Sequence, residues 1–254
     1  MKRHIPNVVT LLNLLCGCIA VIFAVNNHFI AASIFVCLGI FFDFFDGLLA
    51  RKLNVQSPLG IQLDSLADLI TSGVVPGIIM LKLIALSIGV NDFVVFEDSW
   101  SESMTWSKFK ISYLPLFGLL ITLASAYRLA KFNIDEDQQA YFKGLPVPAN
   151  TLVILALPLI LAYQNTNFIS SIILNKWFLV GLTLLSCYLL NSNIKLFALK
   201  FKSWNFKDNT IRYVFLILSI ILLITLKFIA IPLVIVTYIV LSLMDTTNRL
   251  KKEN

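Results

Sequence analysis

The chain has 254 residues, of which 58% are hydrophobic and only 13% are charged, and its mean hydropathy is +0.86. Soluble domains are about half apolar and about a quarter charged, so this composition excludes an ordinary soluble enzyme. The net charge of +6 comes from basic residues in short segments between apolar runs. That distribution points to membrane topology and anionic lipid headgroups, not to nucleic acid.

Apolar runs follow one another along the chain and predict an all-α, polytopic bundle of about eight transmembrane helices, since a spanning helix needs about 20 residues. The first run lacks a small-residue cleavage site, which predicts a retained span instead of a signal peptide. The last two runs are nearly continuous, and we expect a tight helical hairpin around residues 227–232. The runs are residues 7–26, 28–50, 60–90, 111–131, 148–165, 172–192, 211–227 and 228–246.

The basic residues are distributed unevenly between the two sides of such a bundle. Most of the twenty lie in the terminal segments and in the loops near 51–59, 132–147 and 193–210. The opposite side includes the 91–110 connection, which carries four acidic residues. The positive-inside rule then places both termini in the cytoplasm. We expect one membrane-embedded domain over residues 1–254, multi-pass in a cell membrane, with the inner membrane of a bacterium as the expected location.

Four aspartates interrupt the apolar runs, where ionisable residues are costly and mark functional sites. Asp43 and Asp46 lie near the end of the second run, and Asp64 and Asp68 near the start of the third. The 51–59 turn brings these ends to one surface, and a helical period of about 100° per residue puts each pair on one stripe. Four clustered carboxylates repel unless a cation lies among them, and hard divalent cations prefer oxygen ligands. Capping is the weaker interpretation, because Phe flanks both Asp43 and Asp46.

Small residues accompany the aspartates. Gly47, Ala50 and Gly60 leave space beside the carboxylates for a bulky ligand such as a nucleotide diphosphate. Arg51 lies one turn further along and can pair with a phosphate. The sequence therefore predicts a metal and nucleotide site at the cytoplasmic surface of the membrane.

The stretch from Asp43 to Asp68 resembles the motif of the CDP-alcohol phosphatidyltransferase family, D-x2-D-G-x2-A-R-x8-G-x3-D-x3-D, with every fixed position filled. The resemblance implies a donor lipid, CDP-diacylglycerol, and two divalent ions, Mg²⁺ or Mn²⁺, held by Asp43, Asp46, Asp64 and Asp68. It also implies that Asp68 is the general base for the acceptor hydroxyl, that the metals stabilise leaving CMP, and that the protein is a homodimer.

Three further segments are similar to the branch of this family that uses serine: residues 5–17, 128–133 and 142–149. In the first, Asn7 and Thr10 are candidate nucleotide contacts, and an equal alternative is that the Pro6–Asn7 pair starts and caps the helix. The resemblance covers residues 5 to about 150, so we take 1–150 as the catalytic core and 151–254 as additional helices.

Serine is a zwitterion, so its site needs a cation for the carboxylate. Arg128, Lys131 and Lys143 are the candidate phosphate or acceptor contacts, with topology and helix-dipole roles as the alternative. Asn133 is either an acceptor contact or a helix C-cap. The Pro-rich segment 144–149 is either a wall of the pocket or only a stiff turn.

The expected activity is transfer of the phosphatidyl group from CDP-diacylglycerol to L-serine. A sibling enzyme that uses glycerol-3-phosphate or inositol phosphate is the first alternative. Because these acceptors carry a phosphate group, we would expect more basic residues near their site. A transporter with a carboxylate ion site is the second, although transporters are usually built from repeats around a midplane site. A non-catalytic nucleotide-lipid binder would be expected to lack Asp68.

Overall fold

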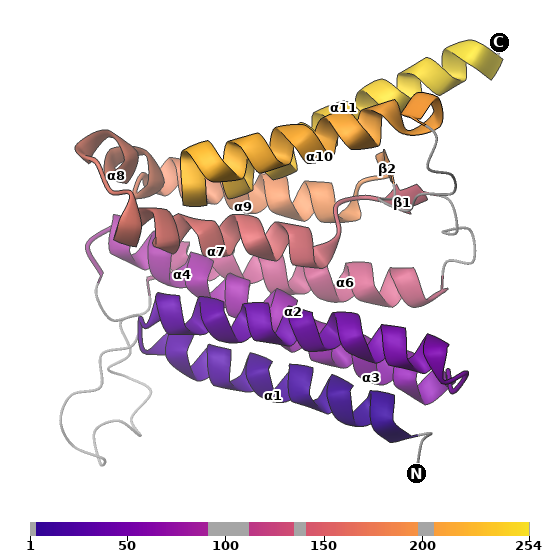
Figure 1. The fold of residues 1–254 in the computed structure, drawn as a ribbon. Helices are drawn as coiled ribbons and strands as arrows, with labels where there is room; N and C mark the ends of the chain where they lie inside the picture. Colours follow the sequence, from indigo (N-terminus) through magenta and orange to yellow (C-terminus); the bar gives the residue numbers. More distant parts are fainter. Residues whose placement is uncertain (1–3, 91–111, 135–140, 198–205, 254) are drawn as a thin grey trace.

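The structure is a computed structural model that describes residues 4–90, 112–134, 141–197 and 206–253. The 91–110 connection used in the topology argument therefore lies outside the described residues. The fold is helical, as predicted, and its helices run along one common direction in a bundle (Figure 1). The start of α1, the α2–α3 connection, the short strands and the end of α11 all lie at one end of the bundle (Figure 1).

The first two helices form a closely packed hairpin, α1 (Ile5–Val25) and α2 (Phe29–Lys52), and α1 also packs against α3 (Pro58–Asp68). The α3 start follows from local sequence. Ser57 has an extended backbone and its side-chain oxygen accepts a hydrogen bond of 3.1 Å from the Gly60 N–H, while Pro58 occupies the first helical turn. This is the ordinary N-cap and N1 pairing, and it fixes where the third predicted run turns back into the bundle.

The third run forms one continuous helical stretch of 30 residues, Pro58–Ser87. Its middle is not α-helical: α3 ends at Asp68, a π-helical segment η2 (Leu69–Val74) follows, and α4 (Val75–Ser87) completes the stretch. A π segment inside a helix is frequent at functional sites. The regular 100° phase used to align the carboxylates therefore holds only as far as Asp68.

The central part of the chain, after α4, is mostly helical. Its helices are η4 (Leu114–Leu119), α6 (Leu120–Ile134), α7 (Val147–Tyr163), α8 (Asn167–Ile173) and α9 (Lys176–Asn191). Two strands that the sequence did not predict, β1 (Tyr141–Lys143) and β2 (Lys195–Phe197), pair antiparallel, with Lys143 opposite Lys195.

Gly144, directly after β1, has φ of +74°, and a Cβ there would lie 2.6 Å from the Leu190 carbonyl oxygen. Its N–H donates to the Ile194 carbonyl at 2.9 Å, so β1 is held against the chain that follows α9. Only glycine combines this backbone conformation with so close an approach.

The last two predicted runs form α10 (Phe206–Leu226) and α11 (Ala230–Glu253), joined by the single turn η5 (Lys227–Ile229). Lys227 has φ of +49°, and α10 and α11 pack against each other. The expected hairpin is confirmed. Gln164 at the end of α7 anchors the turn, because its amide donates to the Leu226 carbonyl at 3.0 Å and accepts from the Ile229 N–H at 3.2 Å.

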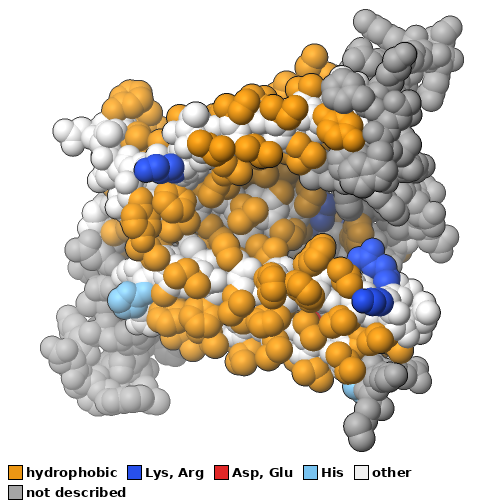
Figure 2. All heavy atoms as spheres, viewed as in Figure 1, with side chains coloured by type: hydrophobic (Ala, Val, Ile, Leu, Met, Phe, Trp, Pro, Cys, Tyr) orange, Lys and Arg blue, Asp and Glu red, His pale blue; other side chains and the backbone are white. Residues whose placement is uncertain are grey.

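Five helical stretches are long and apolar enough to cross a membrane, or six if α8 and α9, which meet at 56°, form one broken span. Hydrophobic side chains cover most of the described surface in the view of Figure 2. The interior holds a main core around α4, with Ile79, Met80 and Ile84 fully buried, and a smaller core where β2 meets α10 and α11. The protein is a multi-pass integral membrane protein.

Candidate active site

Three of the four aspartates converge between α2 and α3. Carboxylate oxygens of Asp43, Asp64 and Asp68 all lie within 4.8 Å of one another. Asp46 stands beside them, only 5% exposed, and accepts a hydrogen bond from the Thr10 hydroxyl of α1. The short connection between α2 and α3 places all four side chains at the same end of the bundle, as the sequence predicted.

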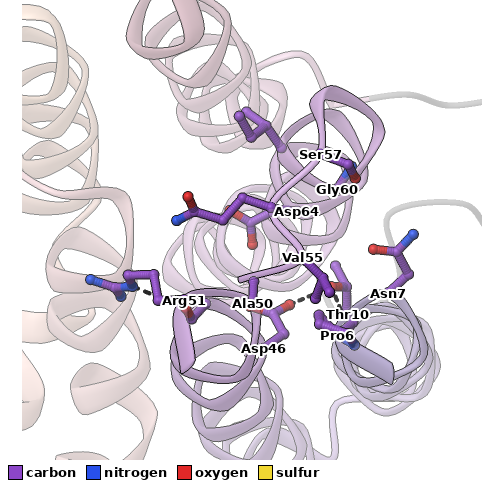
Figure 3. A pocket seen from close by; sticks show the side chains of 13 residues that line it. Pro6, Asn7, Thr10, Asp46, Ala50, Arg51, Val55, Ser57, Gly60 and Asp64 are labelled. Carbon is purple, nitrogen blue, oxygen red and sulfur yellow. Dashed lines mark hydrogen bonds between the residues drawn. The ribbon is translucent and has the colours of Figure 1, made fainter. Parts of the chain in front are cut away.

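One cavity, which we name the α1–α3 cavity, lies next to this cluster (Figure 3). Its volume is about 160 Å³, and α1, α2, α3 and the α2–α3 connection each contribute to its wall. It brings together all six residues expected to contact the nucleotide, and it adds five that the sequence analysis did not select. The expected residues are Asn7, Thr10, Gly47, Ala50, Arg51 and Gly60, with Asp46 and Asp64; the additional ones are Pro6, Val55, Gln56, Ser57 and Ile61.

Arg51 is exposed at the edge of this cavity, and its Nε donates to the Gly47 carbonyl at 2.9 Å. The side chain thereby folds back along its own helix, and in Figure 3 it extends away from Asn7 and Thr10. A guanidinium in this position suits a phosphate group, because its planar donors match phosphate oxygens.

A second, smaller cavity, which we name the basic cavity, is lined by all three of the basic residues expected to contact the acceptor. It is lined by Arg128, Lys131, Phe132, Lys143, Leu190, Asn191 and Ser192. Arg128 is 9% exposed, and its Nε is buried with no hydrogen-bond partner among the described residues. A buried donor without a partner costs about 1–3 kcal/mol, so the guanidinium is suited to an anionic ligand.

Asn133 lies elsewhere. Its Nδ2 donates to the Ser65 hydroxyl at 2.9 Å, and the Ser65 hydroxyl is 3.2 Å from Asn133 Oδ1. This pair joins the end of α6 to α3 one residue after Asp64, and Asn133 does not line the basic cavity. Neither of the two roles weighed for Asn133 included a contact between helices.

Sequence reasoning missed Asn13, Asn191 and Ser192. Asn13 is fully buried in α1 and donates to Asp68, and a polar residue inside an apolar run was the available signal. Asn191 ends α9 and Ser192 follows it, and both line the basic cavity where the Gly144 and Leu145 N–H groups donate to the Ile194 and Leu189 carbonyls. No local pattern in the sequence marks that contact.

The bundle and its carboxylate cluster define a class of protein: a polytopic membrane protein with an oxygen-rich site at one end of its helices. The family model described as CDP-alcohol phosphatidyltransferase matches residues 3–189 of the chain. This match covers well over half of the sequence, and the chain belongs to the CDP-alcohol phosphatidyltransferase family.

Curated relatives sharpen the assignment. A CDP-diacylglycerol–serine O-phosphatidyltransferase of Bacillus subtilis is 34% identical over 169 residues, covering 63% of this chain and 81% of the relative. The enzyme of the same description from Saccharomyces cerevisiae is 31% identical over 170 residues, covering 61% of this chain and 53% of the relative. The one from Helicobacter pylori is 28% identical over 204 residues, covering 80% and 75%. The chain therefore spans about half of the yeast relative and most of the two bacterial ones.

The aspartate cluster fits the divalent metal that the family implies. Three carboxylates from two helices share one small volume, and Asp64 Oδ1 is buried without a hydrogen-bond partner in the described part of the chain. Like charges this close are unfavourable unless a cation offsets them, and hard divalent ions take carboxylate oxygens as ligands. Asp43, Asp64 and Asp68 can hold such an ion, with Asp46 adjacent.

Proposed function

We propose that this protein transfers the phosphatidyl group of CDP-diacylglycerol to the hydroxyl of L-serine and releases CMP. The observation that carries the proposal is the aspartate cluster beside the α1–α3 cavity, in a chain whose described relatives all use serine. Membership of a transferase family leaves no support for the transporter reading.

The proposed roles follow the positions of the residues. Residues lining the α1–α3 cavity hold the CDP part of the donor, with Arg51 at a phosphate. Two divalent ions, Mg²⁺ or Mn²⁺, bound by Asp43, Asp46, Asp64 and Asp68 would neutralise the pyrophosphate and stabilise leaving CMP. Asp68 accepts the proton of the serine hydroxyl as that oxygen attacks the phosphorus next to diacylglycerol, and the bond from phosphorus to CMP breaks.

The acceptor is assigned to the basic cavity. Arg128, Lys131 and Lys143 attract the serine carboxylate. The strongest reason for this placement is that the buried Nε of Arg128 finds no hydrogen-bond partner in the part of the chain that the structure describes. Asn191 supplies the oxygen acceptor that the serine ammonium needs, because its Oδ1 is buried with no partner within the described residues. Asn133 is retained as a residue that positions α6 against α3.

We also propose eight spans, with both termini in the cytoplasm and the site at the cytoplasmic face. Separating α10 from α11 and counting the 17-residue α7 with the bent α8–α9 pair as spans gives this number. Residues 1–150 form the catalytic core of one domain, and 151–254 add helices that complete the basic cavity. A homodimer in a bacterial inner membrane, in contact with membrane lipids and not with nucleic acid, completes the proposal.

The test is CMP release by purified, detergent-solubilised protein supplied with CDP-diacylglycerol and Mg²⁺ or Mn²⁺. Labelled serine, glycerol-3-phosphate and inositol phosphate are tried separately, and label entering lipid is followed. We expect coupled CMP release with serine alone. Release with another acceptor would move the substrate assignment to a sibling enzyme, and no release with any acceptor or metal would refute the enzymatic proposal.

A further inference from the structure

Asn13 links the first helix to the proposed general base. The Asn13 side chain is 0% exposed, and its Nδ2 donates to Asp68 Oδ1 at 3.2 Å. Its Oδ1 accepts from the Thr71 hydroxyl at 2.8 Å. These two contacts connect residues 55 and 58 positions apart in the sequence. The amide is therefore bridged between Asp68 and the π-helical segment that begins directly after it.

Thr71 and Asp68 together favour one orientation of the Asn13 amide. A side-chain amide has one acceptor end and one donor end, and the Thr71 hydroxyl donates to the acceptor end. The NH₂ group is then directed toward Asp68. Thr71 is 0% exposed, and its hydroxyl also lies 3.2 Å from the Asn13 backbone carbonyl, a longer contact than the one to Oδ1. Reversing the amide would place its carbonyl oxygen against the Asp68 carboxylate, which would be repelled, and the hydrogen bond to Asp68 would be lost.

Asn13 and Thr71 are fully buried and closely packed. Gly39 of α2 is the third wall, since a Cβ there would lie 2.7 Å from Thr71 Cγ2 and 2.8 Å from Asn13 Oδ1. The missing side chain lets α2 approach the pair closely. Three elements, α1, α2 and η2, thereby enclose the amide in one orientation.

Resting on the proposed function, we propose that Asn13, anchored by Thr71, is a positioning residue that sets the orientation of the Asp68 carboxylate. Asn13 engages Oδ1, whereas Oδ2 of Asp68 accepts no hydrogen bond from any described residue. The carboxylate is thus held by one oxygen and offers the other to the proton of the acceptor. Orientation matters because a base acts only within hydrogen-bond reach of the proton it removes.

The competing explanation is that the pair only stabilises the packing of α1 on η2. The two explanations differ in what a substitution changes. Loss of orientation lowers kcat and leaves KM for both substrates nearly unchanged, because the cavity walls are untouched. Metal affinity falls less than kcat, because Asp43 and Asp64 are untouched and Asp68, the third carboxylate of the cluster, loses only its fixed orientation. Loss of packing lowers the melting temperature and reduces every property in proportion to the folded fraction.

The experiment uses Thr71→Val, which removes the hydroxyl at nearly constant shape, and Thr71→Ser, which keeps it. Asn13→Leu removes the amide itself. Thr183→Val is the matched control, since Thr183 is equally buried and its hydroxyl only donates to Leu179 of its own helix. The readouts are kcat and KM for serine and CDP-diacylglycerol, Mn²⁺ binding followed by electron paramagnetic resonance, and melting temperature in detergent.

We expect Thr71→Val and Asn13→Leu to lower kcat by about 10- to 100-fold, the range found when a supporting partner of a site is removed. Both KM values and the Mn²⁺ affinity should stay within about threefold of the unsubstituted protein, and Thr71→Ser should restore most of kcat. Thr183→Val should leave kcat unchanged.

Unchanged kcat in both variants would overturn the proposal, as would a fall in Mn²⁺ affinity without a fall in kcat. Failure of both variants to fold would also overturn it, in favour of the packing explanation. Failure of the proposed function gives a different result: the unsubstituted protein then releases no CMP with serine, whatever the variants do.

Discussion

The α1–α3 cavity and the basic cavity differ in how the chain builds them. The first uses three consecutive helices and the connection between two of them, all within residues 6–64. The second collects residues from α6, β1 and the end of α9, spread over 128–192. Short turns fix the geometry of the first cavity. The second cavity depends on the pairing of β1 with β2, in which Lys143 lies opposite Lys195, 52 residues later in the sequence. A site built from neighbouring helices is visible as spacing in the sequence, and a site built from distant strands is not.

The strongest test of the α1–α3 side is Asp68→Asn. The change keeps the shape and the hydrogen bond from Asn13 but removes the base, so we expect kcat to fall by about 10²–10⁴-fold. Binding of CDP-diacylglycerol should weaken far less than turnover, because Asp43 and Asp64 still hold the metal, and the melting temperature should be close to that of the unsubstituted protein. Turnover retained by this variant would remove the base assignment and with it the contrast between the two cavities.

Asp43→Asn tests the metal cluster on the same side. Removing one charge from a group of three carboxylates weakens divalent-ion binding, and we expect Mn²⁺ affinity to fall by about 10- to 100-fold. Metal-dependent binding of CDP-diacylglycerol should be lost with it, as measured by titration in detergent with and without Mn²⁺. Unchanged affinity would contradict a metal role for Asp43.

On the basic side, Arg128→Gln should raise KM for serine by about tenfold or more, because a charge-assisted hydrogen bond contributes about 1.5–3 kcal/mol. KM for CDP-diacylglycerol should change much less, which is the feature that separates the two cavities. Arg128→Lys keeps the charge but not the planar donors, so its KM for serine should lie between that of the unsubstituted protein and that of Arg128→Gln. An equal rise in both KM values would show that the cavities do not bind different substrates.

The smallest effect is expected for Asn133→Ala. Asn133 pairs with Ser65 and lies outside the basic cavity, so KM for serine should stay within about threefold of the unsubstituted value. The lost hydrogen bonds should lower stability by about 1 kcal/mol, seen as a lower melting temperature. Ser65→Ala is the matched control and should give the same loss; a large rise in KM for Asn133→Ala alone would return Asn133 to the acceptor site.

The sequence was sufficient for the helices and for the aspartate cluster. Each of the eight apolar runs contains a helix, because hydrophobic length and turn residues act locally. The four aspartates lie on two helices joined by a short turn. Their spacing in the sequence is therefore almost enough to predict that their side chains lie close together. The hairpin at Lys227 followed in the same way from the length of the run.

Other features depend on contacts that no local pattern records. The contact from Asn13 to Asp68 spans 55 residues, and the β1–β2 ladder joins two segments of three residues each that carry no strand signal in their own sequence. The π-helical segment after Asp68 is set by packing against three neighbouring elements, where Thr71, Thr122 and Thr151 form hydrogen bonds across helices. Tertiary contacts, not propensity, decide these features.

The β1–β2 ladder has a consequence for biosynthesis. The residues of the aspartate cluster are all present once the first 68 residues have been made, but β1 has no partner until residues 195–197 emerge. The Tyr238 hydroxyl then donates to the Phe197 carbonyl at 2.8 Å from a helix made later still. At about 5–20 residues per second, roughly 5 to 20 seconds separate Lys143 from Tyr238 on the ribosome. In that interval the nascent chain already contains the four aspartates, but β2, the partner of β1, and α11 are not yet complete.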